Sequence, residues 1–554
     1  MKILVEGHSY DAALVRDICR DFETAENGRI KVTKVGYYFN PAISDCVLCL
    51  PKIVCDASGA TILGGLTPES LIDTFSHENQ LNENQTAFAR SFSLWTYRTI
   101  STYARLNPDS DIVTKSSDAV ETAPEDDAAE GTLLDVILEI IRFYNANRDY
   151  FIYIIRNLHS GYDRINWQKT IRTKAPVYQN EEPYYLEVIN RRKQIDFDEE
   201  LMIIFHSILH YISTELGFEV HPECSYEPVT GAQFETYLDG YGLIRLNAIK
   251  YKYFSDKDIR LWKLCRAFFL KTSGIHEKDK ISDYLLVGNF EIVFEAMMDA
   301  LISDADLPEM LRNQKDGKIV DHLFRYRSPI DGREIYYIGD SKYYSIGSSV
   351  GDNSIYKQFT YAKNIIQYHF ARSTSRKLDD MGYRDSLTEG YNFSPNFFIS
   401  AFIPDTLSFE DSGLRLRDFS GNKAEEEKHR ISHFENRLFD RDTLWLSHFD
   451  INLLYVMSLY AADDQTEQTR FKESFKDKVF QAARRLLRTK YTFFTVNPLT
   501  LKVDEFVEHY FYLLHGKIYR RDDGTLLLAL EKGHPENNGF LEKLRKVADI
   551  SRDN

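Results

Sequence analysis

One segment of the chain, residues 318–344, restricts the fold more than any other. Two short runs with the composition of β-strands, 318–326 and 334–344, flank a turn-rich segment that contains Pro329 and the dipeptide Asp331-Gly332. Asp-Gly between two such runs is a strong signal for a β-hairpin. We therefore expect the two runs to pair as antiparallel strands.

The second run of this hairpin carries Asp340 and Lys342, which are separated by Ser341. Side chains alternate between the two faces of a strand, so Asp340 and Lys342 share one face and Ser341 points to the other. Asp321, on the first run, can face them across the hairpin. The pattern predicts a site at which two carboxylates and one lysine converge.

This combination of side chains favours metal-dependent chemistry. Two carboxylates at one point repel each other unless a divalent cation neutralises them, and hard oxygen ligands suit Mg²⁺. We expect Asp321 and Asp340 to bind Mg²⁺, with Mn²⁺ as a substitute ion. A lysine beside the metal can orient or deprotonate the attacking water, or stabilise charge on the transition state. Phosphodiester hydrolysis has these requirements.

A helix is expected on each side of the hairpin along the chain. Before the hairpin, Glu291 and Glu295 lie one turn apart beside an apolar helical stripe, so at least one carboxylate can border a buried site. After the hairpin, Gln358 and Tyr361 lie one turn apart near the start of a second helix. The ordered set of helix, hairpin and helix is more specific than Asp-x-Lys alone.

This order of residues resembles the PD-(D/E)XK nuclease superfamily, and within it the McrC-like and LlaJI-type subunits of nucleotide-dependent restriction systems. The positions that match its helix glutamate, first acid, second acid, lysine and post-core Gln-Tyr motif are Glu295, Asp321, Asp340, Lys342 and the pair Gln358/Tyr361. Glu295 is preferred to Glu291 because Phe294 precedes it, as in the Phe-Glu pair typical of this helix in the family. The sequence departs from the motif at Val320, where the superfamily name has proline.

The resemblance implies a Mg²⁺-dependent endonuclease subunit of a bacterial restriction system. It implies that the chain cuts double-stranded DNA together with a separate McrB-like AAA+ GTPase. The chain has no GxxxxGK[ST] motif, so any nucleotide hydrolysis must come from another chain. Segments 35–41, 50–52 and 92–98 look like recurring segments of LlaJI-type chains and imply that the N-terminal region docks onto that partner.

Other interpretations of the same residues stay open. The hairpin and helices could carry only solvated surface charges, or the fold could be an inactive nuclease, although Asp340 and Lys342 are both present. A non-catalytic adaptor could bind DNA and stimulate the partner GTPase. An RNA nuclease is a further alternative, because such a metal site does not distinguish the two sugars.

The length of 554 residues gives a prior of about three or four structural units. We expect an α/β (α+β) fold, with a PD-(D/E)XK core whose mixed sheet is flanked by helices. The expected units are a β-rich or α/β module over 1–106, an acidic flexible linker over 107–131, a helical region with a basic patch over 132–275, the nuclease core over 276–410, and a mainly helical part over 411–554 that completes the nuclease domain.

Contact with DNA must be local, because the net charge of the chain is −16. The densest mixture of basic, aromatic and hydroxyl residues contains Arg164, Lys169, Arg172 and Lys174. This mixture is typical of a phosphate-contacting patch, and equally of a solvated basic strand beside a packed Trp167. A second basic segment, 471–489, is expected to be a helix that either lines a DNA channel or is solvated.

The sequence also favours a cytoplasmic protein. The start of the chain lacks the apolar run of a signal peptide, and no apolar stretch reaches the roughly 18 residues of a membrane span, so we expect no membrane contact. Among the six cysteines, Cys46 and Cys49 form one CxxC motif in an apolar run, but there is no second CxxC to pair with it, which argues against a disulfide framework or a structural zinc site.

Overall fold

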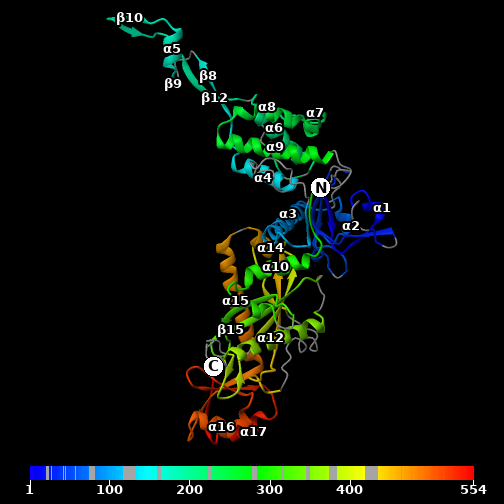
Figure 1. Ribbon diagram of the computed structural model, residues 1–554, viewed down its shortest axis with the longest axis vertical. Coiled ribbons are helices and arrows are strands. Elements are labelled where there is room, and N and C mark those ends of the chain that lie inside the picture. The colour runs from blue at the N-terminus through cyan, green and yellow to red at the C-terminus, as the bar shows by residue number, and fades with distance from the viewer. Residues whose placement is uncertain are drawn as a thin grey trace.

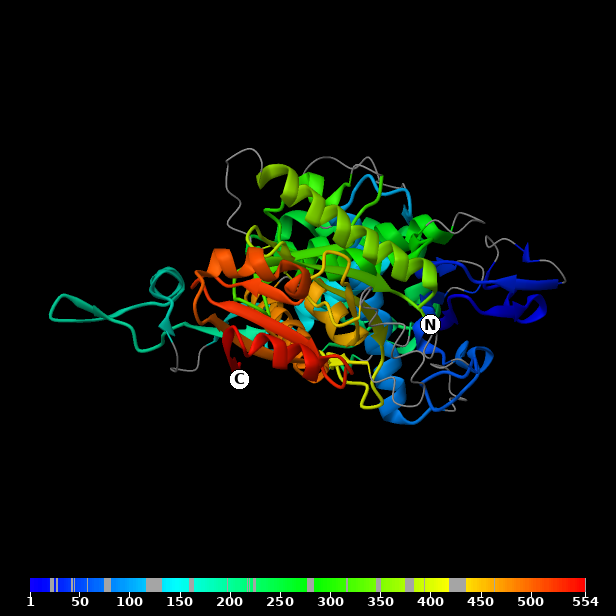
Figure 2. The same cartoon turned by 90° about the horizontal axis from the view of Figure 1, so that it is seen from below.

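The expected hairpin lies in the lower half of an elongated molecule, and a slender arm projects from the opposite end (Figures 1 and 2). The structure is a computed structural model of the chain. It describes residues 1–19, 24–25, 28–40, 43, 45–56, 58–73, 81–115, 132–158, 164–196, 198–216, 218, 220–222, 226–276, 283–314, 317–344, 350–373, 383–392, 394–417, 435–462 and 464–553.

The N-terminal sheet has five strands in the order β1-β6-β5-β13-β7. These strands are β1 (Lys2–Val5), β6 (Asp45–Leu50), β5 (Val35–Asn40), β13 (Tyr284–Val287) and β7 (Val113–Lys115). Only β1 and β6 are parallel, and the other neighbours are antiparallel. A Cβ on Gly36 would lie 2.2 Å from the Leu285 carbonyl oxygen, so glycine is required where β13 approaches β5. The long helix α3 (Glu83–Leu106) contacts β5, β6 and β13.

This sheet corrects three expected boundaries. The module does not end at residue 106, because β7 and β13 complete its sheet, and it contains a 24-residue helix, α3, as well as strands. Part of the expected acidic linker, residues 113–115, is strand β7, and residues 116–131 lie outside the described residues. The expected nuclease core, 276–410, began too early, because β13 within it belongs to the N-terminal sheet. The pairing of β13 with β5 joins segments almost 250 residues apart, and no local pattern encodes such a partner.

Smaller elements flank the N-terminal sheet. A three-stranded sheet in the order β2-β4-β3 and two short helices comprise β2 (Ser9–Asp11), β4 (Arg29–Lys31), β3 (Thr24–Ala25), α1 (Ala12–Val15) and α2 (Pro68–Leu71).

The helical region follows as expected and carries the arm. Its helices are α4 (Leu133–Ala146), α6 (Glu200–Thr214), α7 (Ala232–Thr236), α8 (Gly242–Ile249) and α9 (Asp256–His276). The arm, residues 153–195, consists mainly of strands, which the expectation of a helical region missed: β8 (Tyr153–Leu158), β9 (Arg164–Ile165), α5 (Trp167–Thr173), β10 (Val177–Gln179), β11 (Glu182–Tyr184) and β12 (Asn190–Ile195). Its strands are mostly exposed, so they lack the apolar alternation by which a half-buried strand is recognised.

The hairpin belongs to a second five-stranded sheet, in the order β14-β15-β18-β20-β19. Its strands are β14 (His322–Arg327), β15 (Glu334–Lys342), β18 (Pro395–Phe402), β20 (Trp445–Asn452) and β19 (Arg415–Leu416). Strands β15, β18 and β20 are parallel and both outer pairs are antiparallel, so the sheet is mixed, as expected. The surrounding helices are α10 (Phe290–Ile302), α11 (Glu309–Arg312), α12 (Asp352–Ser373), α14 (Leu453–Ala461) and α15 (Gln465–Lys490). Two short strands, β16 (Arg384–Asp385) and β17 (Gly390–Tyr391), form a separate hairpin.

The C-terminal part is less helical than expected. Its first strands, β19 and β20, complete the mixed sheet, but residues 491–552 form a separate sheet in the order β22-β23-β21-β24, with two helices. The elements are β21 (Tyr491–Pro498), α16 (Val503–Leu514), β22 (Ile518–Arg520), β23 (Leu526–Glu531), α17 (Asn537–Leu544) and β24 (Ala548–Arg552). Strand β23 is rich in leucine, which favours helices, but its burial between two strands overrides that preference.

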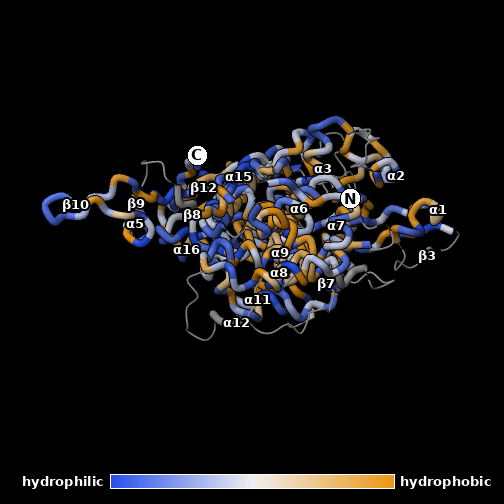
Figure 3. The backbone as a smooth tube through the Cα atoms, turned by 90° about the horizontal axis from the view of Figure 1, so that it is seen from above, coloured by the Kyte–Doolittle hydropathy of each residue, from blue (hydrophilic) through white to orange (hydrophobic). Residues whose placement is uncertain are grey.

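One cluster of buried hydrophobic residues runs from the N-terminal sheet through the helical region to the mixed sheet, and residues 496–548 have a separate core. Hydrophobic segments accordingly gather in the middle of the molecule, whereas the tip of the arm at β10 is hydrophilic (Figure 3). Within the described residues, every helix is too short or too polar to cross a bilayer.

Candidate active site

The β14–β15 hairpin forms as expected and places two aspartates opposite each other. The strands are antiparallel, and the register pairs His322 with Gly339. Asp321 lies one residue before β14 rather than within it, and continuation of this register sets it opposite Asp340. At the other end of the hairpin, Gly332 has a φ of +79°, which suits glycine in a tight turn.

Asp340 and Lys342 lie on one face of β15, as the alternation predicts. Both are buried, with 2% and 8% of their surface exposed, and they form an ion pair. Ser341 lies on the other face, where its hydroxyl is 2.6 Å from Nε2 of His322. The neighbouring parallel strand β18 sets Phe398 beside Asp340, and the Lys342 ammonium lies 5.6 Å from the centre of that ring. The ion pair therefore lies at the ends of two buried parallel strands, beside an aromatic ring.

The carboxyl groups of this site resist being charged together. Burial, followed by the charge of Asp340 and a hydrogen bond between the two carboxyl groups, raises the pKa of Asp321 well above its usual range. Burial, and then Glu291 and Asp340, raise the pKa of Glu295 to about 7, against the opposing charges of Lys342 and Lys357. The site therefore favours protonated carboxyl groups unless a cation compensates the negative charge.

Lys342 responds in the opposite direction. Burial by itself acts to lower the pKa of Lys342, but the Asp340 carboxylate, together with Tyr344 and Asp321, outweighs burial and the pKa is raised. Lys342 is therefore a charged hydrogen-bond donor at neutral pH. Of the two roles expected for this lysine, orientation and charge stabilisation fit this state better than removal of a proton from water.

Two helices bring the other predicted residues toward the sheet. Helix α10 contacts β14 and β15, and its Glu295 interacts electrostatically with Asp340 and Lys342. Helix α12 contacts β15, and its Gln358 and Tyr361 are both fully buried. Neither Oε1 nor Nε2 of Gln358 has a hydrogen-bond partner among the described residues. A buried amide in this state can take a polar ligand.

The donor set fits a hard divalent cation in part. Asp321 and Asp340 supply opposed carboxylates, which a divalent cation would neutralise. Among the residues that the structure describes, however, no three His, Cys, Asp or Glu side chains are grouped as a metal centre. A cation here would therefore complete its coordination with water and phosphate oxygens, as Mg²⁺ commonly does.

Comparison with known proteins places the chain in a family. The model of the LlaJI restriction endonuclease family matches residues 103–381, half of the chain. The chain belongs to the LlaJI restriction endonuclease family. The matched span contains all six predicted residues of the site, and the architecture of the chain is mixed α/β.

Solved structures add only a distant likeness. One is a refined half-complex from a tetradecameric assembly of Thermococcus gammatolerans McrB AAA+ hexamers with bound McrC, at 9% identity over 86% of this chain and 99% of that chain, with a TM-score of 0.25. Another is the cryo-EM structure of the Thermococcus gammatolerans McrBC complex, at 10% identity over 55% of this chain and 90% of that chain, with a TM-score of 0.20. Likeness at this level carries no argument. No curated protein matches the chain.

The predicted basic patch lies in the family span but apart from the acidic site. Arg164, Lys169 and Arg172 are exposed on the arm, and Lys174 pairs with Glu187. Trp167 is 52% exposed, so it is not the packed tryptophan of the alternative interpretation. The arm projects from one end of the molecule, whereas β15, which carries the acidic site, lies in the lower half between α10 and the C-terminal elements α16 and α17 (Figure 1).

Sequence reasoning missed a polar pair beside the site of this LlaJI-family chain. Ser400, on β18, is the register partner of Lys342, and its hydroxyl lies 2.7 Å from Nε2 of His448 on β20. Both are almost fully buried. The available signal was weak, because each of the two strands carries more than one polar residue and nothing in the local pattern pairs Ser400 with His448.

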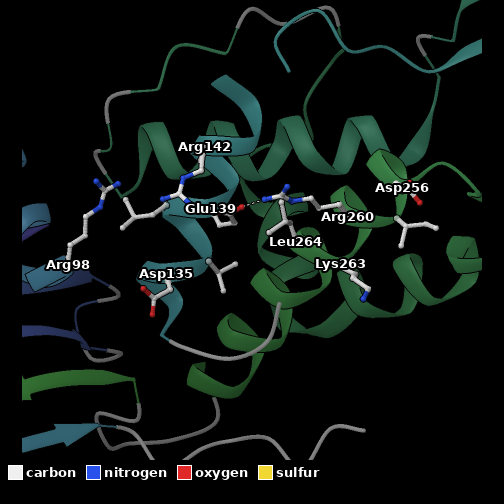
Figure 4. A pocket seen from close by; sticks show the side chains of 11 residues that line it. Arg98, Asp135, Glu139, Arg142, Asp256, Arg260, Lys263 and Leu264 are labelled. Atoms are coloured by element: carbon white, nitrogen blue, oxygen red, sulfur yellow. Dashed lines mark hydrogen bonds and ion pairs between the residues drawn. The ribbon is translucent and has the colours of Figure 1, made fainter. Parts of the chain in front are cut away.

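A cleft of about 630 Å³ lies between α3, α4 and α9, away from the site (Figure 4). Its charges largely compensate one another, since Glu139 pairs with both Arg142 and Arg260. We assign this cleft no role in catalysis.

Proposed function

We propose that this chain is the Mg²⁺-dependent DNA endonuclease subunit of a bacterial restriction system, with a PD-(D/E)XK core, acting in concert with a separate McrB-like AAA+ GTPase. The observation that carries the proposal is the placement of Asp340 opposite Asp321 and in an ion pair with Lys342, in a chain of a restriction endonuclease family.

Asp321 and Asp340 would hold Mg²⁺, or Mn²⁺ in its place, and Glu295 would border the cation or its bound water. The cation would supply Lewis acidity at the scissile phosphate and a more acidic bound water. Lys342, kept charged by Asp340, donates hydrogen bonds to the attacking water or to a phosphate oxygen. Gln358 and Tyr361, one turn apart on α12 and both buried, would support the site from the helix that contacts β15.

DNA and the partner are proposed on separate grounds. The exposed Arg164, Lys169 and Arg172, with Lys174 beside them, would contact backbone phosphates through the arm. The AAA+ partner is proposed from the resemblance to McrC-like and LlaJI-type subunits, with the N-terminal module as its docking surface, and the lack of a P-loop in this chain is consistent with a separate nucleotide-hydrolysing subunit.

Plasmid cleavage tests the proposal. The wild-type chain and the Lys342→Ala variant are each incubated with supercoiled plasmid and Mg²⁺. Each is assayed with and without GTP and the AAA+ protein encoded next to this chain. Lys543→Ala, which removes an exposed lysine from α17, is the matched control. We expect nicking or linearisation that Lys342→Ala loses and Lys543→Ala keeps.

One observation favours a second function, a non-catalytic adaptor that binds DNA and stimulates the partner GTPase. Within the described residues no three-ligand metal centre is formed. The adaptor predicts that Asp340→Ala leaves GTPase stimulation and restriction of phage unchanged. Absence of cleavage in every condition, together with a rise in partner GTPase activity when the chain is added, would support the adaptor over the nuclease.

A further inference from the structure

A basic cleft lies at the turn end of the β14–β15 hairpin, remote from the two aspartates. It has a volume of about 350 Å³ and is formed by the end of β14, the C-terminal half of α15 and the C-terminal sheet. Four arginines line it, namely Arg327, Arg484, Arg488 and Arg521, and we call it the basic cleft. Asp553 is its one acidic lining residue.

The arginines of the basic cleft are only partly neutralised. Arg521 donates to both carboxylate oxygens of Asp553, at 3.0 and 2.7 Å. Arg327 lies 3.0 Å from Asp477, but both side chains are about half exposed, so solvent screens that pair. Among the described residues, neither Arg484 nor Arg488 forms an ion pair with a carboxylate, and both are exposed. The cleft keeps an excess of positive charge in a chain whose net charge is −16.

The same helix shows what a neutralised basic residue looks like. In the N-terminal half of α15, Lys476 is buried and lies 2.8 Å from Asp304, and Lys472 lies 3.2 Å from the same carboxylate. These two lysines stabilise the contact between α15 and the segment before β14. Among the described residues Arg484 and Arg488 form no ion pair of this kind, and Arg488 acts on Asp553 only as a more distant charge, so both guanidinium groups can reach a ligand in the cleft.

The chemistry of the basic cleft selects a phosphate. Guanidinium groups offer planar, paired donors that match phosphate oxygens, and a cluster of them is the usual way to bind a phosphodiester. The guanidinium of Arg327 lies 4.2 Å from the centre of the Phe480 ring, which limits the positions it can take. The cleft has no glycine-rich loop of the kind that cradles nucleoside triphosphates.

We propose that the basic cleft binds a backbone phosphate of double-stranded DNA whose scissile phosphate lies at the acidic end of the hairpin. The placement of the scissile phosphate at the acidic end rests on the proposed function. The six residues of β14 span about 20 Å, which corresponds to about six nucleotide steps of a duplex. The basic cleft would therefore hold the flank of the DNA, several base pairs from the cut.

Duplex binding without divalent cations tests the proposal independently of cleavage. Fluorescence anisotropy with a labelled duplex of about 30 base pairs gives Kd over a series of salt concentrations. The double variant Arg484→Ala/Arg488→Ala is compared with Arg485→Ala, which removes half as much charge from an exposed position on α15 outside the cleft. We expect the double variant to bind about tenfold more weakly, and its slope of log Kd against log salt to fall by about 2.

Arg484→Lys/Arg488→Lys should recover part of the affinity, because it restores charge without the paired donors. Wild-type affinity and salt slope in the double variant would overturn the proposal. Half of these logarithmic losses in Arg485→Ala, which removes half of the charge, would overturn it too, because a loss proportional to charge would indicate bulk charge rather than a site. Displacement of the duplex by GTP or inorganic phosphate at micromolar concentration would reassign the cleft to a free nucleotide or phosphate. Binding that follows the prediction while plasmid stays uncut would retain the DNA contact and reject the nuclease.

Discussion

The two ends of the β14–β15 hairpin carry opposite kinds of charge, and one is buried while the other is exposed. At the open end, Asp321 and Asp340 face each other in a largely buried environment, where burial raises the pKa of Asp321 and a lysine pairs with Asp340. At the turn end, Arg327 joins three further arginines around an open cleft. One end therefore favours a cation and the other an anion, over a distance of about 20 Å.

This contrast teaches how burial separates chemistry from binding. A buried charge is costly unless it is compensated, so its pKa and its ligands are strongly constrained. Exposed arginines carry their charge at little cost and act through proximity and geometry. The buried acidic end therefore suits catalysis, and the exposed arginines suit the binding of a long polyanion.

Removal of the acid at the open end should have the largest effect. Asp340→Ala deletes one of the two proposed metal ligands, and a metal contributes several kcal/mol to transition-state stabilisation, so we expect cleavage to fall by about 10³-fold or more. Circular dichroism should show an unchanged fold. The control is Asp306→Ala, whose exposed carboxylate pairs with Arg325 at the surface. Residual cleavage near the wild-type rate would remove Asp340 from the site.

The two halves of α15 give a second contrast, this time in stability. Lys476→Ala removes the buried partner of Asp304 and leaves Lys472 as its remaining cation, and breaking a buried ion pair costs about 3 kcal/mol. Arg484→Ala, at an exposed position, should change the free energy of unfolding by less than about 0.5 kcal/mol. Thermal unfolding of both variants checks this order. Similar Tm values for the two would mean that Lys476 is not neutralised internally.

The local parts of this comparison were predictable from sequence. The Asp-Gly turn, the antiparallel pairing and the shared face of Asp340 and Lys342 each depend on a few neighbouring residues, and the structure confirms all three. Asp321 was placed within the strand but lies just before it. The choice of Glu295 over Glu291 came from the family resemblance and stays a prediction, and the structure shows that Glu295 interacts electrostatically with Asp340.

The remaining features depend on partners that are distant in sequence. The pairing of β13 with β5 and the contact between Ser400 and His448 join segments whose local patterns name no partner. The sequence of the basic segment 471–489 left a DNA channel and a solvated face open, and it did not show that Asp304 neutralises lysines in its first half only. Local pattern gives a residue its element and face, but only tertiary packing decides whether a charge is buried, paired or available.

The acidic end should bind cations more tightly as pH rises. Below about pH 7 Glu295 holds a proton, and Asp321 holds one to higher pH, so a cation must displace protons. The apparent Kd for Mg²⁺ should fall about tenfold per pH unit for each displaced proton between about pH 6 and 7. Calorimetry in two buffers of different ionisation enthalpy measures the protons released. Glu295→Gln should reduce that number by one, and a Kd independent of pH would contradict the assignment of a cation to these carboxylates.

The smallest effect concerns stability without metal. The folded-state pKa of Asp321 is raised, so its stabilising contribution is complete below the unfolded value near 3.9 and is lost as pH rises through the folded pKa. Asp321→Asn carries no charge, and in EDTA at about pH 8 it should therefore raise the free energy of unfolding by about 1–2 kcal/mol. Near pH 4 the two chains should be equally stable. Asp306→Asn, on the surface, should show no such dependence. A gain of equal size at both pH values would mean that the effect comes from packing rather than from charge. The expected result is that Asp321→Asn is more stable than the wild type only at high pH, and that Mg²⁺ stabilises the wild type but not the variant. That result would show that the cation compensates the buried negative charge at this end of the hairpin.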